Sequence, residues 1–336
     1  MIELGGKRPA RIDAAARARD LASRDYEVKR TEILAEVTRR FIRLLARQHG
    51  LALAKANVEL RTATLGEVRR RVGAGADSPL EEKKAGTALA RARIAAEHVE
   101  HQVRVARHEL AAMWGSGAPR FERLEGDLFG RRAVPFYDEL LARLAASPDI
   151  VRSLSEKQLR EAEIRLADAK RVPNMSLGGG VRRLEGSGDN ALVLGLSMPL
   201  PLSDRNQGGS QEARALLGKA EGAARATEAR LRSLLFGLHQ ELLHDATALD
   251  AFEREILPGA EESLALSRSG FAGGRFSYLE LADAERTLGE VKSERIETAA
   301  SYHQFVLEIE RLLGGPIEEK PGSGETPPAK EKALEQ

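Results

Sequence analysis

The residues that decide the fold are MSLGGGVRRLEGSGDNALVLGLSMPLPL, which occupy positions 175–202. Apolar residues alternate with small or polar ones on both sides of a turn-forming cluster at 186–190, and this period of two predicts a β-hairpin with strands of about ten residues. A hairpin alone leaves both of its edges unpaired, so it requires further strands beside it. One face of the second strand is almost entirely apolar, and we expect that face to meet lipid. Its residues are Leu192, Leu194, Leu196, Met198 and Leu200.

Long helices are expected on both sides of the hairpin, because apolar residues recur there at intervals of three and four. We predict helices over residues 9–72, 79–114, 149–169 and 205–269, and a last helix that carries Leu281 to Leu312. The first and fourth have roughly 60 residues and would each span about 90 Å, so they must bury their apolar stripes in coiled-coil-like pairs. Pro258 is expected to kink the fourth helix. The predicted fold class is therefore mainly α with a small β part.

The two halves of the chain repeat each other. Each half has a Gly turn followed by a Ser with a Glu three positions later, which is the pattern of a helix-starting capping box. Each repeat thus reads strand, long helix, tight turn, long helix. The second repeat is preceded by a helix and a strand, so we expect a helix, a strand and an export signal to precede Met1 in the gene. Gly75, Ser78, Leu80 and Glu81 lie 199 positions before Gly274, Ser277, Leu279 and Glu280.

Composition and motifs exclude several classes of function. The 52 Lys and Arg against 51 Asp and Glu leave a formal net charge of +1, so no nucleic-acid partner is expected. The chain has no cysteine, which excludes thiolate metal sites and cysteine nucleophiles. It has no P-loop, nucleophile elbow or His-Glu-x-x-His motif, so we expect neither an enzyme nor a cofactor. His98 and His101 form an i,i+3 pair, but a solvated helix face accounts for them better than a metal site.

These features resemble the TolC-type outer-membrane efflux factors. The resemblance rests on strand–helix–helix repeats around a Gly-x-x-Ser-x-Leu-Glu turn, and it covers residues 1 to about 314. The opening IELGGKR at 2–8, the MWG at 113–115 and the PLPL at 199–202 are similar to the heavy-metal (CzcC-like) branch. The resemblance implies a homotrimer in the outer membrane of a Gram-negative cell, with one shared β-barrel and one periplasmic α-barrel. It also implies a periplasmic adaptor and an inner-membrane pump as partners, and a passive conduit for heavy-metal cations or small toxic compounds.

The same resemblance implies roles for the two turns. Glu280 and Asp283, with Glu81 at the matching place of the first repeat, would ring the channel constriction, where converging carboxylates favour cations. The alternative is that Glu280 only caps its helix while Asp283 is solvated. The turns themselves would contact the adaptor. Their residues are Gly75, Ser78, Leu80, Gly273, Gly274, Ser277 and Leu279.

The predicted organisation has seven parts, and two other interpretations stay open. One is a soluble coiled-coil scaffold, which would leave the leucine face of the hairpin without a purpose. The other is a truncated efflux protein without function, which the DNA upstream of Met1 would test. The parts are a remnant of a first β-hairpin (1–8), a long helical hairpin (9–114), an equatorial linker (115–148), a helix (149–172), the membrane hairpin (173–204), a second helical hairpin (205–314) and a disordered tail (315–336).

Overall fold

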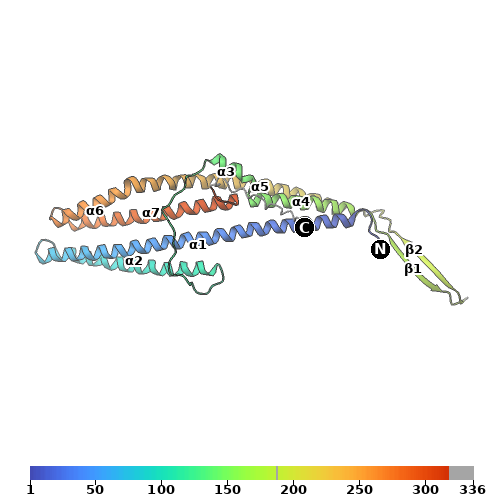
Figure 1. Cartoon of the computed structure of the whole chain (residues 1–336), viewed down its shortest axis with the longest axis horizontal. Coiled ribbons are helices and arrows are strands. Elements are labelled where there is room, and N and C mark those ends of the chain that lie inside the picture. The colour runs from blue at the N-terminus through green and yellow to red at the C-terminus, as the bar shows by residue number, and fades with distance from the viewer. Residues whose placement is uncertain (187, 318–336) are drawn as a thin grey trace, which may run out of the picture.

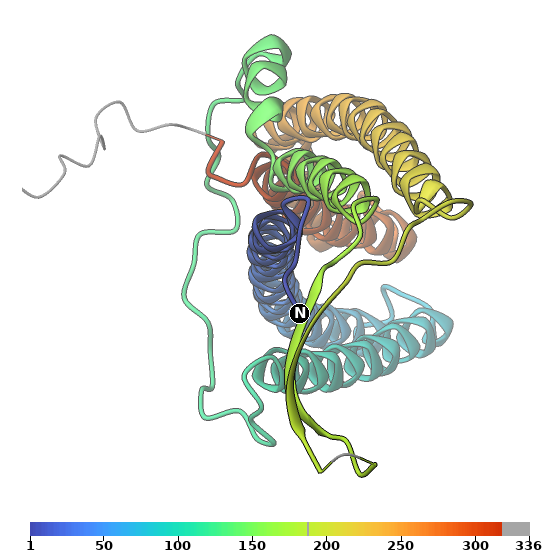
Figure 2. The same cartoon turned by 90° about the vertical axis from the view of Figure 1, so that its right-hand side faces the viewer.

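The chain folds as an elongated helical bundle from one end of which a β-hairpin projects (Figure 1). A computed structural model describes residues 1–186 and 188–317. Seen along the bundle, the helices form an open arc rather than a closed core (Figure 2). None of the described helices combines the length and the apolar composition that a membrane-spanning helix requires. The predicted fold class, mainly α with a small β part, is confirmed.

Two antiparallel helical hairpins build the bundle. The first pairs α1 (Lys7–Gly73) with α2 (Pro79–Ala112). The second pairs a continuous helical rod with α7 (Tyr278–Leu313), and this rod consists of α5 (Gln207–Ala251), the π-helical turn η2 (Phe252–Ile256) and α6 (Leu257–Ala272). Helices α1 and α7 are in contact with each other in the middle of the arc, while α2 and the rod form its two edges (Figure 2).

The internal repeat is exact at the tip of the bundle. Gly75 and Gly274 both have a left-handed backbone, with φ of 73° and 70°. The helices that follow them, α2 and α7, begin 199 positions apart, at Pro79 and Tyr278. Two pairs of buried residues keep the same offset, Ala85 with Ala284 and Leu89 with Leu288.

Between α1 and the rod, the offset becomes 198 on the strand side of η2, and the π-turn explains the change. A π-turn accommodates one extra residue within a helix, so the rod gains one position relative to α1. The turn directly precedes Pro258, which has no N–H to donate to the turn before it. The kink predicted at Pro258 stays a prediction, and η2 is the irregularity that the structure has beside this residue. Three pairs of core residues show the offset of 198. They are Val37 with Leu235, Leu44 with Leu242, and Leu51 with Leu249, the first of each pair from α1 and the second from α5.

The β-hairpin consists of β1 (Ser176–Arg183) and β2 (Asn190–Ser197), paired antiparallel with Ser176 opposite Ser197. Each strand has eight residues, so the predicted length of about ten was too long. Met198 and Leu200 follow β2 rather than belonging to it, because Pro199 and Pro201 cannot donate ladder hydrogen bonds. Ahead of the helices, Ile2 forms an isolated antiparallel bridge with Met175.

A long connection ties the two helical hairpins together on the convex side of the arc (Figure 2). Residues 113–136 lead from α2 to α3 (Tyr137–Arg143), a 3-10 turn, η1 (Leu144–Ala146), and α4 (Pro148–Ala169), which packs between α1 and α5. We call residues 121–135 the strap. Its Leu128 is almost fully buried. The Tyr302 hydroxyl of α7 donates to the Arg132 carbonyl at 2.9 Å and accepts from its N–H at 3.1 Å.

Two local predictions were wrong. The Ser78 hydroxyl accepts from the N–H of Leu80 at 3.2 Å, so it caps α2, but it does not form the predicted capping box with Glu81. The predicted disordered tail begins too early, since Ile317 is buried and Arg143 donates to its carbonyl at 2.7 Å. The remainder of that tail, 318–336, lies outside the described residues.

Candidate functional site

The two turns lie at the end of the bundle farthest from the β-hairpin (Figure 1). Each closes through the same pair of positions, with Ala76 N–H donating to the Arg71 carbonyl and Arg275 N–H to the Gly270 carbonyl, both at 2.8 Å. The left-handed residues Gly75 and Gly274 make such tight reversals possible, since a Cβ there would be strained. The structure thus places all seven predicted adaptor-contact residues at or beside one tip, where Leu80 and Leu279 are exposed.

Arg71 joins the two turns to each other. Its guanidinium donates to both carboxylate oxygens of Asp77, at 2.6 and 3.0 Å, and to the carbonyl of Phe271 in the other hairpin at 2.8 Å. It also lies over the Phe271 ring, 4.7 Å from its centroid. Such charged, bidentate contacts are stronger than neutral hydrogen bonds. The tip is therefore held as one unit within the chain.

The second turn replaces this ion pair by an aromatic contact. Gly270 and Phe276 occupy the places of Arg71 and Asp77, 199 positions on. The Phe276 ring covers Gly270 so closely that a Cβ on Gly270 would lie 2.2 Å from it. Only glycine fits beneath the ring. Phe276 itself is 41% exposed at the tip.

Glu280 forms a capping box with Ser277 at the start of α7, as the sequence pattern predicted. Its carboxylate accepts from the Ser277 N–H at 2.6 Å and from the Ser277 hydroxyl, and the Ser277 oxygen accepts in turn from the Glu280 N–H. The hydrogen bond from the backbone N–H lowers the pKa of Glu280, so this side chain is a carboxylate at neutral pH. Asp283 is exposed and paired with Arg286 at 2.6 Å. Glu81 lies in the first turn of α2 at the same tip.

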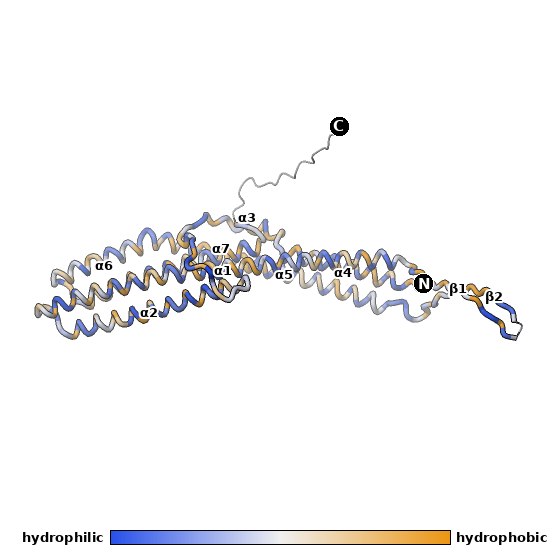
Figure 3. The backbone as a smooth tube through the Cα atoms, turned by 60° about the horizontal axis from the view of Figure 1, so that its bottom comes forward, coloured by the Kyte–Doolittle hydropathy of each residue, from blue (hydrophilic) through white to orange (hydrophobic). Residues whose placement is uncertain are grey.

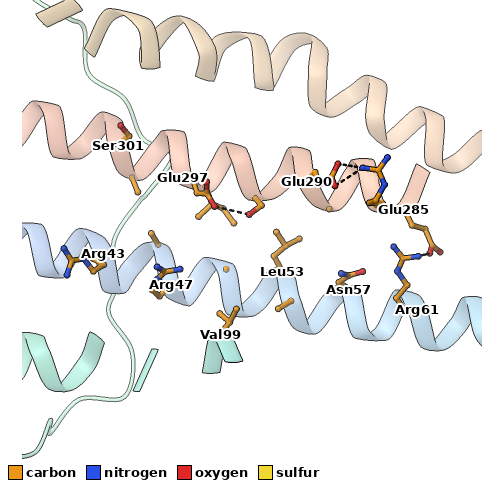
Figure 4. A pocket seen from close by; sticks show the side chains of 18 of the residues that line it. Arg43, Arg47, Leu53, Asn57, Arg61, Val99, Glu285, Glu290, Glu297 and Ser301 are labelled. Carbon is orange, nitrogen blue, oxygen red and sulfur yellow. Dashed lines mark hydrogen bonds and ion pairs between the residues drawn. The ribbon is translucent and has the colours of Figure 1, made fainter. Parts of the chain in front are cut away.

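A groove runs between α1 and α7 above the tip and encloses about 670 Å³ (Figure 4). One wall is basic, with Arg43, Arg47 and Arg61 from α1, and the other is acidic, with Glu290 and Glu297 from α7. The charges on the acidic wall are held within α7, since Arg286 bonds both oxygens of Glu290. Small residues at the middle of the groove, such as Gly50 and Gly289, leave the two helices incompletely packed.

The groove ends at a buried ion pair. Glu285, whose side chain is fully buried, lies with Oε2 2.7 Å from Arg61 Nη1, while its other oxygen accepts from the Thr64 hydroxyl. The Arg61 contact is well placed for charge but poorly angled for a hydrogen bond, which leaves Oε2 without a hydrogen-bond partner among the described residues. Burial raises the pKa of Glu285, and Thr64 and Arg61 oppose that rise. Removing one member of such a pair is more destabilising than replacing both.

Sequence reasoning missed these cross-hairpin contacts. Glu285 carries a signal that could have been noticed, because it lies on the buried stripe of α7 between Leu281 and Leu288, where a charge requires a partner. The partner Arg61 could not have been named, since it is 224 positions away. Nothing in the sequence distinguishes Arg71 from the neighbouring arginines of α1 as the residue that contacts the second turn.

The β-hairpin has two chemically different faces. One carries Leu177, Val181 and the predicted residues Leu192, Leu194 and Leu196, which are 64–77% exposed. Their cross-strand pairing, Leu177 with Leu196 and Val181 with Leu192, makes this face continuous. The other face pairs Ser176 with Ser197 and Gly178 with Gly195. Hydrophilic residues gather at the hairpin's tip, beyond the apolar region (Figure 3).

The model of the family described as outer membrane efflux protein matches residues 1–116 and 140–315. The chain belongs to the outer membrane efflux protein family. It is 32% identical over 314 residues to the cobalt-zinc-cadmium resistance protein CzcC of Cupriavidus metallidurans, covering 93% of this chain and 75% of that protein. It is 24% identical over 208 residues to the nickel-cobalt-cadmium resistance protein NccC of Alcaligenes xylosoxydans xylosoxydans, covering 62% of this chain and 47% of that protein.

Solved structures agree on the fold of this outer membrane efflux protein. The open-state MtrE outer membrane channel of Neisseria gonorrhoeae superposes with a TM-score of 0.73 at 19% identity, over 93% of this chain and 73% of that one. A structure of CusC gives 0.69 at 16% identity, over 93% and 75%. The predicted fold is thereby confirmed, and the family match confirms the predicted resemblance and the outer-membrane location.

Proposed function

We propose that this efflux protein is the outer-membrane channel subunit of a tripartite efflux system, a passive conduit and not an enzyme. The observation that carries the proposal is the two-faced β-hairpin at one end of an open helical arc. Its apolar face suits lipid and its small, polar face suits a water-filled lumen, as in transmembrane β-barrels. One hairpin cannot close a barrel. Three copies would pool their strands in one barrel and their arcs in one periplasmic tube.

Heavy-metal cations are the cargo that we propose, with small toxic compounds as the alternative. The support is the likeness to CzcC, named for cobalt, zinc and cadmium resistance, over nearly the whole chain. The outer-membrane lipid, a periplasmic adaptor and an inner-membrane pump are the proposed partners, with the adaptor docked on the two turns at the tip.

The test is metal accumulation in cells. Deleting the gene should raise cellular cobalt, zinc and cadmium under metal challenge, and the intact gene should restore efflux. A Leu194→Arg gene should fail to restore it, while Val193→Arg, on the other face of the same strand, should succeed. Normal metal levels with raised levels of organic compounds in the deletion strain would favour the alternative cargo. Unchanged levels of both metals and organic compounds in the deletion strain would contradict the proposal that the protein is an efflux conduit.

We further propose that Glu280 and Asp283, together with Glu81, line the closed mouth of the tube. Three copies would bring these carboxylates into one ring, and such rings favour cations. In planar bilayers, replacing Glu280 and Asp283 together with Ala should raise conductance or reduce cation preference. A Glu280→Gln variant is the matched control, because glutamine can still accept the cap hydrogen bond but lacks the charge. Unchanged conductance and selectivity in both variants would mean that the two carboxylates serve only as cap and solvated groups.

A further inference from the structure

The apolar face of the β-hairpin ends in a positive charge. Successive side chains of a strand point to opposite faces, so Arg183, the last residue of β1, lies on the same face as Val181. The two strands pair Val181 with Leu192 and, on the next rung of this face, Arg183 with Asn190. Arg182 lies on the opposite face. The two adjacent arginines therefore meet different surroundings.

Arg183 is exposed and has no charged partner in the part of the chain that the structure describes. The acidic residues nearest in sequence, Glu185 and Asp189, belong to the turn of the hairpin. This turn is held through its backbone, with Leu184 N–H donating to the Asp189 carbonyl at 2.8 Å. All five N–H donors of the Arg183 guanidinium are thus available to a ligand. A charge on a face that meets lipid is costly unless it is paired.

The apolar face is long enough to place this charge at a membrane surface. Its exposed residues on the second strand and just beyond are Leu192, Leu194, Leu196, Met198 and Leu200. At about 3.3 Å per residue and a tilt of about 40°, the stretch from the first to the last of them rises about 20 Å, close to the apolar band of about 25 Å in transmembrane barrels. The next rung, which carries the arginine, therefore lies where the band ends.

The direction of the hairpin decides which membrane surface this is. The turn of the hairpin points away from the helices (Figure 1). With the helices on the periplasmic side of the outer membrane, the Arg183 rung lies at the outer leaflet.

We propose that Arg183, together with the side-chain amide of Asn190, binds the phosphate group of an anionic lipid headgroup in the outer leaflet. The inference rests on the proposed function, because it takes the leucine face to be the lipid-facing one. A guanidinium donates two parallel hydrogen bonds to phosphate oxygens, and the amide NH₂ of Asn190 can donate another. The contact fixes how deep the strands lie in the bilayer.

A lipid fits this site better than a free phosphate ion does. The acyl chains of a lipid cover the leucine face, while its phosphate reaches the rung directly beyond. The two contacts reinforce each other, because both belong to one molecule. A free phosphate ion would gain only the charged contact, and it would gain that contact in competition with water.

The test compares Arg183→Gln with Arg182→Gln, which removes the adjacent charge from the opposite face. Each protein is purified from outer membranes in a neutral detergent and titrated with fluorescent lipid A that carries two phosphates. Arg183→Gln should weaken binding about fivefold, as expected for one arginine at a lipid surface. Arg182→Gln should bind as the unchanged protein does. Arg183→Lys should retain most of the affinity, because it keeps the charge.

Two further titrations identify what the site recognises. Lipid A without its phosphates should bind equally to the unchanged protein and to all the variants. Inorganic phosphate, at the same concentration as the lipid, should not displace it. Displacement by inorganic phosphate would assign the site to a free anion and overturn the lipid assignment. Equal losses in the Arg182→Gln and Arg183→Gln proteins would show that only the total charge of the hairpin matters, which would also overturn the inference.

Alkaline extraction of the outer membranes separates the possible failures. If the Arg183→Gln protein stays in the membrane and binds lipid A as tightly as the unchanged protein, the phosphate site is overturned and the proposed function stands. If extraction releases the unchanged protein itself, its hairpin is not inserted in lipid, and both the proposed function and the phosphate site are contradicted.

Discussion

At the scale of single residues, the contacts that matter most are those where one side chain serves two elements. Arg71 belongs to α1, closes its own turn through Asp77 and reaches the backbone of the second turn at Phe271. Leu194 belongs to a strand, yet its neighbours on that face come from the partner strand as well, and it packs over Gly179. Arg71 and Leu194 each support a prediction, and the preceding residue in the chain supplies the control variant.

Replacing Arg71 with Ala should loosen the tip without unfolding the bundle. The change removes charge-assisted hydrogen bonds, each worth about 1.5–3 kcal/mol, and frees the second turn from the first. Hydrogen exchange should become faster in the amides of residues 73–78 and 271–277. Arg70→Ala is the control, because Arg70 is exposed and, among the residues that the structure describes, its side chain bonds only Glu67 on its own helix. Equal exchange in both variants would show that Arg71 does not hold the turns together.

Replacing Leu194 with Arg should destabilise the protein in the membrane by about 2–4 kcal/mol if the position lies near the bilayer midplane. Val193→Arg should cost much less, since Val193 lies on the face with Gly180 and Ser197. Denaturant unfolding of the membrane-inserted protein measures the difference. Equal tolerance at the two positions would contradict the assignment of the leucine face to lipid.

At the scale of elements, the strap is the part that fixes how the two helical hairpins stand relative to each other. Three of the seven histidines contact it, one from each of α1, α5 and α7. His303 Nε2 lies 3.0 Å from the Leu128 carbonyl, His239 Nε2 lies 3.0 Å from the Pro135 carbonyl, and His49 meets the Phe129 ring edge-on. Ionic contacts add to these, with Arg131 bonding Asp250 of α5 and Glu253 of the π-turn.

The strap should become less stable as pH falls below about 6.5, the ordinary histidine pKa. Burial lowers the pKa of both His303 and His49. The unfolded state then binds protons that the folded state does not, so folding stability declines as pH falls from the unfolded value towards the folded one. Asp127 opposes the shift at both sites, while Arg132 at His303, and Arg123 and Arg295 at His49, reinforce it.

Hydrogen exchange at residues 128–132, measured between about pH 7 and pH 5, tests this titration. Exchange, corrected for its intrinsic pH dependence, should show a loss of protection on acidification. A His303→Gln variant should lose less, because the amide can still donate to Leu128 but does not titrate. The same loss in both proteins would assign the effect to other groups.

At the scale of the whole molecule, the fold places the regions of its proposed functions at separate points along one axis. The hairpin that suits lipid lies at one end, the two turns at the other, and the strap between them (Figure 1). This separation means that a change at the tip should act on docking without acting on membrane insertion.

Replacing Gly274 with Val tests that separation. Gly274 has a φ of +70°, which a β-branched residue rarely adopts, so the turn should distort beside Arg71. Co-purification of the adaptor should fall severalfold, while cross-linked trimers form in normal yield. Gly218→Val is the control, since Gly218 lies in α5 with open space around it. Loss of trimers in the Gly274 variant would show that the tip also supports assembly.

The sequence by itself determined what depends on local pattern. Periods of 3.6 and 2 placed the long helices and the hairpin, and the cap at Ser277 and Glu280 could be recognised because its partners lie within one helical turn. The repeat was visible for the same reason, since its turns recur as short motifs. Tertiary structure alone decided the rest. Arg61 with Glu285 and Arg71 with Phe271 join helices from different repeats, and their partners follow from the way whole helices pack. The π-turn was not predicted either. An extra residue within a helix shifts which side chains lie on its buried face, and that face is defined by the neighbouring helices, which the sequence does not identify.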